Sequence, residues 1–201
     1  DRSIERKARE AYLAAELDDR YSKADLLEAY LNIAYFGRRA YGIEAAAQRF
    51  FGRHALDLDL AQSTFLVGLL LSGLVLLGMG RLVSTQGNYK HVVSALAHAS
   101  FVDKLLGNAV RLFLIISKKS AMQASTSLAL LFPRMEVTSA AYVILGQIDF
   151  FQLWLFGILA YGLARIFSIS MKKALLISYG FWLIKSLLYI GLGLFGLQYM
   201  R

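Results

Sequence analysis

The stretch Phe65–Gly80, FLVGLLLSGLVLLGMG, contains sixteen consecutive residues without a charge. It approaches the roughly twenty apolar residues that a helix needs to cross a bilayer core. Residues 1–64, which precede it, hold ten Lys or Arg and eleven Asp or Glu, whereas residues 65–201 hold twelve Lys or Arg and three acids. The sequence therefore predicts two domains, a charged one over residues 1–64 and an apolar one over residues 65–201.

The formal charge of +8 lies wholly in the apolar domain. A nucleic-acid-binding protein usually gathers its Lys and Arg on a water-facing patch, but here the cations flank apolar runs. Such positions are typical of topology determinants and of contacts to lipid headgroups. We therefore predict membrane lipids and not nucleic acid as partners. Because the chain has no cysteine, disulfides and thiolate metal sites are excluded, and we expect no metal and no cofactor.

Later apolar runs predict further membrane helices. They cover residues 92–117, 121–132, 150–169 and 174–200. The last two are long enough to span a bilayer, the first is interrupted by charges, and the second is short. We therefore expect a multi-pass bundle of four or five spans. Arg111, Arg165 and Lys185 lie in or near these runs, where each is expected to snorkel or to pair with Asp103 or Asp149.

The charged domain shows helical patterns and no strand signal. Apolar residues recur at spacings of three and four over residues 3–20, as in a half-buried helix. Ser22, followed three residues later by Asp25, predicts the N-cap of a second helix. Further helices are predicted over residues 41–51 and 58–70. The whole chain is therefore predicted to be all-α.

Arg6, Lys7 and Glu10 form the densest polar group of the charged domain. Residues three and four apart project from one face of a helix, so the three side chains can meet there. Two cations beside a carboxylate can hold an anion. The alternative is a solvated face with local ion pairs, and the spacing alone leaves both interpretations open.

Several short motifs follow one another in this domain. They are Arg6-Lys7-x-x-Glu10, Lys23-x-x-Leu26-Leu27-Glu28-x-Tyr30-Leu31-Asn32, Tyr35-Phe36-Gly37, Ala40-Tyr41-Gly42-Ile43-Glu44-Ala45-Ala46-Ala47 and Phe51-Gly52. In this order and spacing, residues 1–70 resemble the later part of family 51 glycosyltransferases. These are the peptidoglycan glycosyltransferases of penicillin-binding proteins and of monofunctional transglycosylases.

The resemblance implies a truncated, lysozyme-like helical unit followed by the multi-span transmembrane bundle. It also implies lipid II, or another glycan on a lipid diphosphate, as a ligand and the bacterial inner membrane as the location. Arg6 and Lys7 would neutralise the diphosphate leaving group, and Glu10 would be the functional carboxylate of the motif. The residues of the second motif, which would shape the cleft, are Lys23, Tyr30 and Asn32.

Two departures from the family pattern bear on activity. The family's acid–base glutamate lies in a Glu-Asp-x-x-Phe-x-x-His-x-Gly motif followed by Gly-x-Ser-x-x-x-Gln-Gln, and neither motif occurs in these 201 residues. Arg39 stands near a position where the family has glycine, and Gln62 stands where it has glutamate. Because a base must activate the acceptor hydroxyl, we expect that this chain does not polymerise lipid II unaided.

The apolar domain resembles a different family. The residues that carry this resemblance are Gln86–Lys90, Val92–Ser100, Ile148–Trp154 and the Lys-Lys-Ala stretch at 172–174. They are similar to a glycine-containing loop before one helix, and to an aspartate-containing turn before another, in Yip-type integral membrane proteins. Over residues 72–200 the chain therefore resembles a multi-spanning family that offers no catalytic residues to carry over.

Three interpretations of the whole chain follow. The first is a membrane protein in which a partial glycosyltransferase domain, inactive on its own, is fused to the Yip-like domain. The second is a non-catalytic membrane scaffold or organiser of Yip type, in which the charged domain only docks or stabilises. The third is a chimera produced by assembly or design. Homo- or hetero-oligomers through the transmembrane helices are compatible with the first two.

Overall fold

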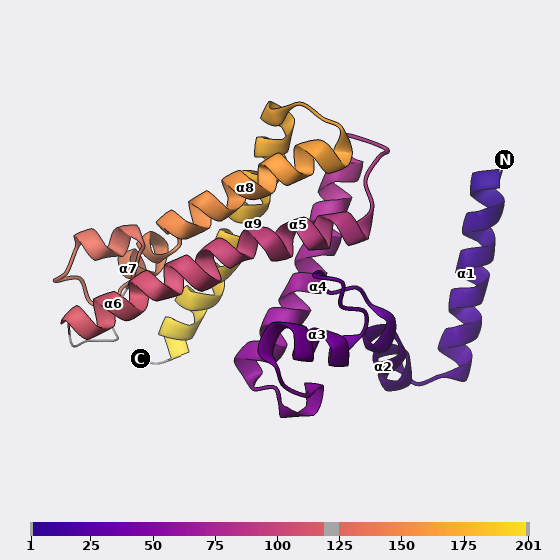
Figure 1. Cartoon of the computed structure of the whole chain (residues 1–201), viewed down its shortest axis with the longest axis horizontal. Helices are drawn as coiled ribbons and strands as arrows, with labels where there is room; N and C mark the ends of the chain where they lie inside the picture. Colours follow the sequence, from indigo (N-terminus) through magenta and orange to yellow (C-terminus); the bar gives the residue numbers. More distant parts are fainter. Residues whose placement is uncertain (1, 119–124, 200–201) are drawn as a thin grey trace. The chain divides into compact units, whose positions relative to one another are not determined.

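A computed structural model describes residues 2–118 and 125–199 of the chain (Figure 1). Within these residues the regular structure is helical, and the only β pairing is two isolated bridges. The all-α prediction is therefore confirmed. The chain divides into two compact units, Asp1–Val67 and Gly68–Arg201, which we call unit 1 and unit 2.

Helix α1 (Arg2–Arg20) forms where the sequence predicts it but buries little of its surface. Its apolar residues Ile4 and Tyr12 are 68% and 70% exposed. Ion pairs between side chains four residues apart run along it and join Arg6 to Glu10, Arg9 to Glu5 and Arg20 to Glu16. Such pairs contribute only a few tenths of a kcal/mol each, about 0.2–0.5. Good helix formers and local ion pairs, and not burial, therefore support α1.

Helix α2 (Lys23–Ile33) begins at the predicted capping box. The hydroxyl of Ser22 accepts the backbone N–H of Asp25 at 3.2 Å, and the carboxylate of Asp25 accepts the N–H of Ser22 at 3.1 Å. This helix ends at Ile33. The cause is Ala34, which is already extended at φ −61° and ψ 145°.

Helix α3 (Ile43–Phe51) is bounded by two glycines in the left-handed region of φ, Gly42 at 83° and Gly52 at 65°. A short 3₁₀ turn, η1 (Ala55–Asp57), follows. The core of unit 1 is small because most of its elements are short. Its buried apolar residues are Ala34, Phe36, Ala40, Ala46, Ala47 and Leu66.

The two capping glycines offer a matched test of the unit 1 turns. A Cβ on Gly42 would lie 2.6 Å from the carbonyl oxygen of Asn32, whereas a Cβ on Gly52 would meet nothing within 4 Å. We expect Gly42→Ala to lower the free energy of opening of α3 by about 2–3 kcal/mol, and Gly52→Ala by about 1 kcal/mol. Hydrogen exchange of the α3 amides in the full chain measures both, and equal effects would contradict this packing.

Helix α4 (Leu60–Arg81) contains the boundary between the units. The sequence predicted a helix over residues 58–70 and a separate membrane run from Phe65, but the two are one continuous helix. The reason is that neither a glycine with positive φ nor a proline lies between them.

Three helical segments of unit 2 follow one another without a break (Figure 1). They are α5 (Tyr89–Phe101), the π-helical segment η2 (Val102–Gly107) and α6 (Asn108–Lys118). The side chain of Asn88 accepts the N–H of Lys90 at 3.0 Å and caps the start of α5. The predicted run 92–117 is therefore helical throughout, with a wider turn in its middle.

The remaining elements of unit 2 are η3 (Leu128–Leu131), α7 (Ala140–Gly146), α8 (Phe150–Phe167) and α9 (Met171–Tyr199). Helix α8 packs against both α5 and α9, and α7 packs against α9. Side chains between these helices form the core of the unit. Its most buried members are Val92, Val93, Leu159, Leu163, Phe167 and Ala174.

Phe167, the last residue of α8, packs its ring against the end of α4 and against the loop that follows α4. Its ring is fully buried and lies where a Cβ on Gly80 or Gly87 would stand. The hydroxyl of Ser84 donates to the carbonyl oxygen of Phe167 at 2.7 Å. The two glycines therefore let the backbone approach the ring closely enough to close the core at this end.

Three helices are long and apolar enough to cross a membrane in the part of the chain that the structure describes. They are Leu60–Arg81, Phe150–Phe167 and Met171–Gly196. The predicted run 92–117 is divided by its π-helical segment, and the run 121–132 lies partly outside the described residues. Length and composition thus allow three spans in these residues, and the count of four or five spans stays a prediction.

Candidate functional site

The predicted ligand-binding residues Arg6, Lys7 and Glu10 meet on one face of α1. A guanidinium nitrogen of Arg6 lies 2.7 Å from one carboxylate oxygen of Glu10, and the ammonium of Lys7 lies 2.8 Å from the other. The side chains of Arg6 and Lys7 are 64% and 71% exposed. Both cations are therefore held by one carboxylate and stay accessible from solvent.

The same contacts fix the charge of the carboxylate. The hydrogen bond from Lys7, together with the charges of Lys7 and Arg6, lowers the pKa of Glu10 below its ordinary value, against a smaller effect of burial. Glu10 is thus ionised at neutral pH, and the three side chains carry a net charge of about +1. A general base works best with a pKa near the operating pH. This geometry therefore suits Glu10 to holding cations better than to transferring protons.

The predicted cleft residues Lys23, Tyr30 and Asn32 lie on α2. The ammonium of Lys23 pairs with the carboxylate of Asp18 and ties the start of α2 to the end of α1. The side chain of Tyr30 is exposed, and so is that of Asn32. In the described part of the chain, neither makes a side-chain hydrogen bond to the α1 residues. The structure therefore brings Arg6, Lys7 and Glu10 together but leaves the α2 residues apart from them.

A second polar group of unit 1 was not found from the sequence. One carboxylate oxygen of Glu44 accepts the backbone N–H of Ala55 at 2.8 Å, and the other lies 2.8 Å from Nδ1 of His54. The Ala55 hydrogen bond, followed by those from Gln48 and His54, lowers the pKa of Glu44. Glu44 thus fastens the loop after α3 to the first turn of that helix. No spacing rule links a glutamate to an N–H eleven residues later, so sequence patterns gave no signal.

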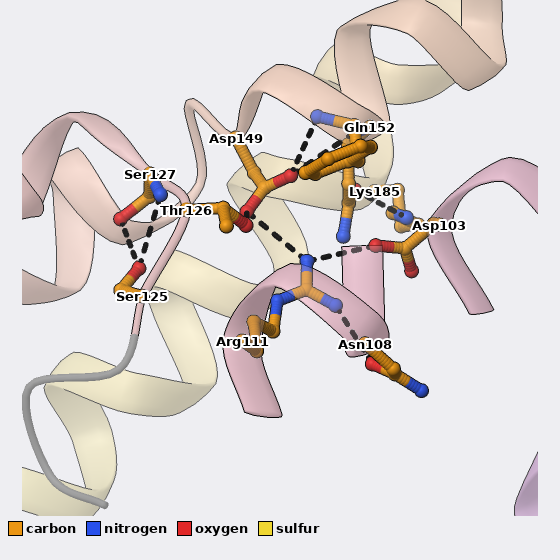
Figure 2. A network of polar contacts seen from close by, with 10 residues as sticks. Asp103, Asn108, Arg111, Ser125, Thr126, Ser127, Asp149, Gln152 and Lys185 are labelled. Carbon is orange, nitrogen blue, oxygen red and sulfur yellow. Dashed lines mark hydrogen bonds and ion pairs between the residues drawn. The ribbon is translucent and has the colours of Figure 1, made fainter. Parts of the chain in front are cut away.

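The largest polar network lies in unit 2 and is centred on Arg111 (Figure 2). Its guanidinium donates to the carboxylate of Asp103 at 2.8 Å and to that of Asp149 at 3.1 Å. The two aspartates are only 8% and 5% exposed. A third bond joins the guanidinium to the side chain of Asn108 at 2.9 Å. The predicted pairing of Arg111 with Asp103 or Asp149 is confirmed, and the arginine in fact bridges both.

The π-helical segment makes this bridge geometrically feasible. Residues eight apart are offset by about 80° in a regular α-helix, which would turn Asp103 away from Arg111. A wider π turn absorbs part of that offset, so both side chains lie on one face. Gly107 leaves the space between them, because a Cβ there would stand 3.0 Å from the Asp103 carboxylate and 3.2 Å from the Arg111 guanidinium.

Asp149 links the network to the start of α8. One of its carboxylate oxygens accepts the backbone N–H groups of Phe151 and Gln152 at 2.9 and 3.2 Å, which makes Asp149 the N-cap of α8. The other oxygen accepts the hydroxyl of Thr126 at 2.5 Å (Figure 2). A short bridge between Ser127 and Asp149 holds the two segments side by side. Four donors therefore satisfy this buried carboxylate.

Polar contacts also join α8 and α9. The ammonium of Lys185 donates to the side-chain oxygen of Gln152 at 3.0 Å and lies 5.2 Å from the ring centre of Phe156. The hydroxyl of Ser178 donates to the Phe156 carbonyl at 2.6 Å, and that of Tyr179 to the Leu153 carbonyl at 2.9 Å. These bonds fix the register of the two apolar helices, where burial alone gives little directional preference.

The network is suited to holding helices together and not to binding a metal. Its carboxylates are occupied by Arg111, and the described residues contain no group of three His, Cys, Asp or Glu placed to hold a metal ion. Its energetic weight comes from the cost of an unpaired charge in an apolar environment.

Substitution of Arg111 tests how much the network contributes to the stability of unit 2. We expect Arg111→Met to destabilise unit 2 by about 3–5 kcal/mol, because two buried carboxylates lose their shared cation. The matched control is Arg165→Met, which should cost about 1 kcal/mol or less. Within residues 2–118 and 125–199 Arg165 forms no ion pair, and its guanidinium carbon lies 5.7 Å from the ring centre of Tyr161. Thermal unfolding of the full chain in detergent micelles compares the two. Similar losses of stability would contradict the central place of Arg111.

Comparison with known proteins finds a family model that matches the N-terminal segment. Residues 1–76 match the family model described as Transglycosylase. The predicted site residues Arg6, Lys7, Glu10, Lys23, Tyr30 and Asn32 all lie within that segment. The resemblance of residues 1–70 to peptidoglycan glycosyltransferases is therefore supported, whereas the Yip-type resemblance of residues 72–200 stays a prediction.

Similar curated proteins are penicillin-binding proteins of bacteria. Penicillin-binding protein 2a of Streptococcus pneumoniae is 35% identical over 104 residues, which are 52% of this chain and 14% of that protein. Penicillin-binding protein 2D of Bacillus subtilis is 45% identical over 69 residues, 34% of this chain and 10% of that protein. Penicillin-binding protein 1A of Clostridium tetani is 47% identical over 66 residues, 33% of this chain and 8% of that protein.

The matched part is thus a small fraction of each relative, between 8% and 14% of its length in these three. No solved structure matches the chain. The N-terminal segment of this chain is therefore similar to the transglycosylase family and to short segments of penicillin-binding proteins, and the chain also contains helices that are long and apolar enough to span a membrane.

Proposed function

We propose that unit 1 binds the diphosphate of a lipid-linked glycan such as lipid II and contributes that part of a peptidoglycan glycosyltransferase site. The observation that carries the proposal is the meeting of Arg6 and Lys7 on one accessible face of α1, within the segment that matches the transglycosylase family. The candidate membrane helices of unit 2 would tether the chain to the membrane that carries a lipid-anchored ligand. On this proposal the chain is a multi-pass protein of a bacterial inner membrane.

In the proposed reaction a sugar hydroxyl attacks the anomeric carbon of the lipid-linked glycan. A new glycosidic C–O bond forms, the bond to the diphosphate breaks, and the diphosphate leaves with the electron pair. Fixed cations stabilise the charge that develops on its oxygens. Arg6 offers a planar fork of N–H donors and Lys7 a compact ammonium, so together they can contact both phosphate groups.

Glu10 would act through these cations. Without the carboxylate, the adjacent charges of Arg6 and Lys7 would repel each other and spread into solvent. With it, their side chains converge at 2.7 and 2.8 Å and are pre-ordered for an anion. Because Glu10 stays ionised, the proton of the attacking hydroxyl must go to another base. The acid–base motif of the family does not occur in these residues, so we propose that the chain binds the lipid diphosphate and does not polymerise it unaided.

Ligand binding by the full chain in detergent micelles tests this proposal. We expect saturable binding of lipid II, or of moenomycin, a family inhibitor that mimics the donor glycan. Arg6→Ala and Lys7→Ala should each raise the Kd at least about tenfold, because each removes a charge-assisted contact. Isothermal titration calorimetry measures the constants.

The control is Arg20→Ala. Arg20 is also an exposed arginine of α1, 67% accessible and 2.6 Å from Glu16 four residues earlier, but it lies at the other end of the helix. Its substitution should leave the Kd unchanged. No saturable binding, or equal losses in all three variants, would overturn the proposal.

A non-catalytic membrane scaffold of Yip type is the second candidate. The observation that favours it lies in the segment Ile148–Trp154, one of those similar to Yip-type proteins. In this segment Asp149 caps α8 and bonds to Arg111, so the segment orders a large part of unit 2. On this proposal unit 1 docks or stabilises, and oligomers would form through the transmembrane helices. Failure of lipid II and moenomycin to bind would leave this candidate in place.

A further inference from the structure

The turn between α2 and α3 holds two arginines in a strained backbone conformation. Gly37, Arg38 and Arg39 follow one another with φ of 86°, 49° and 62°. The left-handed region is open to glycine but costs energy for a residue with a Cβ. Strained residues of this kind persist where the surrounding structure determines them, and they cluster at functional sites. A glycine at position 39 would form this turn without strain. The presence of an arginine there therefore points to a role for its side chain.

Hydrogen bonds and buried neighbours anchor the turn. The N–H of Phe36 donates to the carbonyl of Ala40 at 3.0 Å, and the N–H of Ala40 donates to the carbonyl of Gly37 at 2.9 Å. Phe36 and Ala40 are 0% and 2% exposed. The turn is thus anchored by the core of unit 1, and it presents the side chain of Arg39 from a fixed position.

Beside the turn lies a pocket of about 390 Å³. It is lined by Arg39, Ala40, Ala45, Gln48 and Arg49. In the described part of the chain, neither Arg39 nor Arg49 has a carboxylate within ion-pair distance. The two alanines contribute only small side chains to this lining. Two arginines from different elements therefore border one open space, and neither charge is neutralised by the protein.

The local charge adds to this effect. Residues 34–56 contain four arginines and a single acid, Glu44. The carboxylate of Glu44 is engaged by the backbone of Ala55, by His54 and by Gln48. An anion that enters the pocket thus meets an excess of positive charge. A phosphate group, with several acceptor oxygens and two negative charges, matches two guanidinium forks best.

We propose that this pocket is a phosphate-binding site, in which Arg39 and Arg49 hold the anion and the strained turn aims Arg39 at it. The site is separate from the Arg6, Lys7 and Glu10 face of α1 and does not rest on the function proposed for that face. Its ligand is either soluble phosphate or the phosphomonoester headgroup of a lipid, because both present the same oxygens.

The test uses the full chain in phosphatidylcholine nanodiscs, titrated with inorganic phosphate in a calorimeter. Arg49→Gln and Arg39→Gly should each weaken phosphate binding at least about tenfold, since each removes one charge-assisted contact. Arg39→Gly carries a second readout. Because glycine adopts φ 62° freely, this variant should show unchanged or slower hydrogen exchange in the turn while it loses the ligand.

The matched control is Arg38→Gly. It relieves strain at the neighbouring residue, φ 49°, but Arg38 does not line the pocket, and its guanidinium carbon lies 5.6 Å from the ring centre of Phe50. Phosphate affinity should be retained. Absence of phosphate binding, equal affinity in Arg39→Gly and the parent, or loss of binding only in Arg6→Ala would each overturn the proposal.

A second set of nanodiscs that contain phosphatidic acid identifies the source of the ligand. If the headgroup reaches the pocket, it competes, and the apparent Kd for inorganic phosphate rises at least about tenfold over that in phosphatidylcholine alone. If the pocket takes only soluble phosphate, the Kd stays the same. Either result supports the site, provided that the Arg39→Gly and Arg49→Gln losses are present.

Discussion

A charged side chain that lies beside like charges, or that is buried away from water, needs an ion pair with a side chain of opposite charge. Both units of this chain are organised by that constraint. In unit 1 the carboxylate of Glu10 draws Arg6 and Lys7 to one face of an otherwise lightly packed helix. In unit 2 the guanidinium of Arg111 draws two buried aspartates together and so joins η2, α6 and the start of α8. The same interaction thus orders an accessible site in one unit and a buried junction in the other.

The two settings have opposite consequences for function. At Arg111 the guanidinium, the two carboxylates and the neighbouring donors satisfy one another within the protein, so the network contributes stability and specificity of helix packing. At Arg6 and Lys7 one carboxylate faces two cations, and the site keeps a net positive charge in contact with solvent. A surplus of positive charge on an accessible face is what a diphosphate requires. This difference is the physical reason for assigning ligand binding to unit 1.

Local rules account for much of the fold. The capping box of Ser22 and Asp25 and the i, i+4 spacing of Arg6 and Glu10 are both short-range patterns, and each appears as predicted. The sequence did not predict that residues 58–70 and the following apolar run form one helix, α4. The composition changes along this segment, but the preference of the backbone for helix does not.

Long-range features were harder to predict. The sequence offered Asp103 or Asp149 as a partner for Arg111, with snorkelling as the alternative, but it gave no sign of the π turn that aligns Asp103 with it or of the bond from Thr126 to Asp149. The contact between Glu44 and Ala55 and the pocket beside Arg39 depend on how turns fold back, which hydrophobic periodicity does not encode. The assignment of Tyr30 and Asn32, on α2, to the cleft rested on the family resemblance alone. Both side chains are exposed, so their role stays a prediction.

The central claim is that the Arg6, Lys7 and Glu10 face of α1 receives the lipid diphosphate. The most direct measurement is photo-crosslinking of the full chain, in nanodiscs, with a lipid-linked diphosphate glycan that carries a photoreactive group beside its phosphates, followed by mass spectrometric mapping. The account predicts attachment within α1, on side chains next to Arg6 and Lys7, and competition by unlabelled lipid II. Attachment confined to unit 2, or undiminished by the competitor, would contradict it.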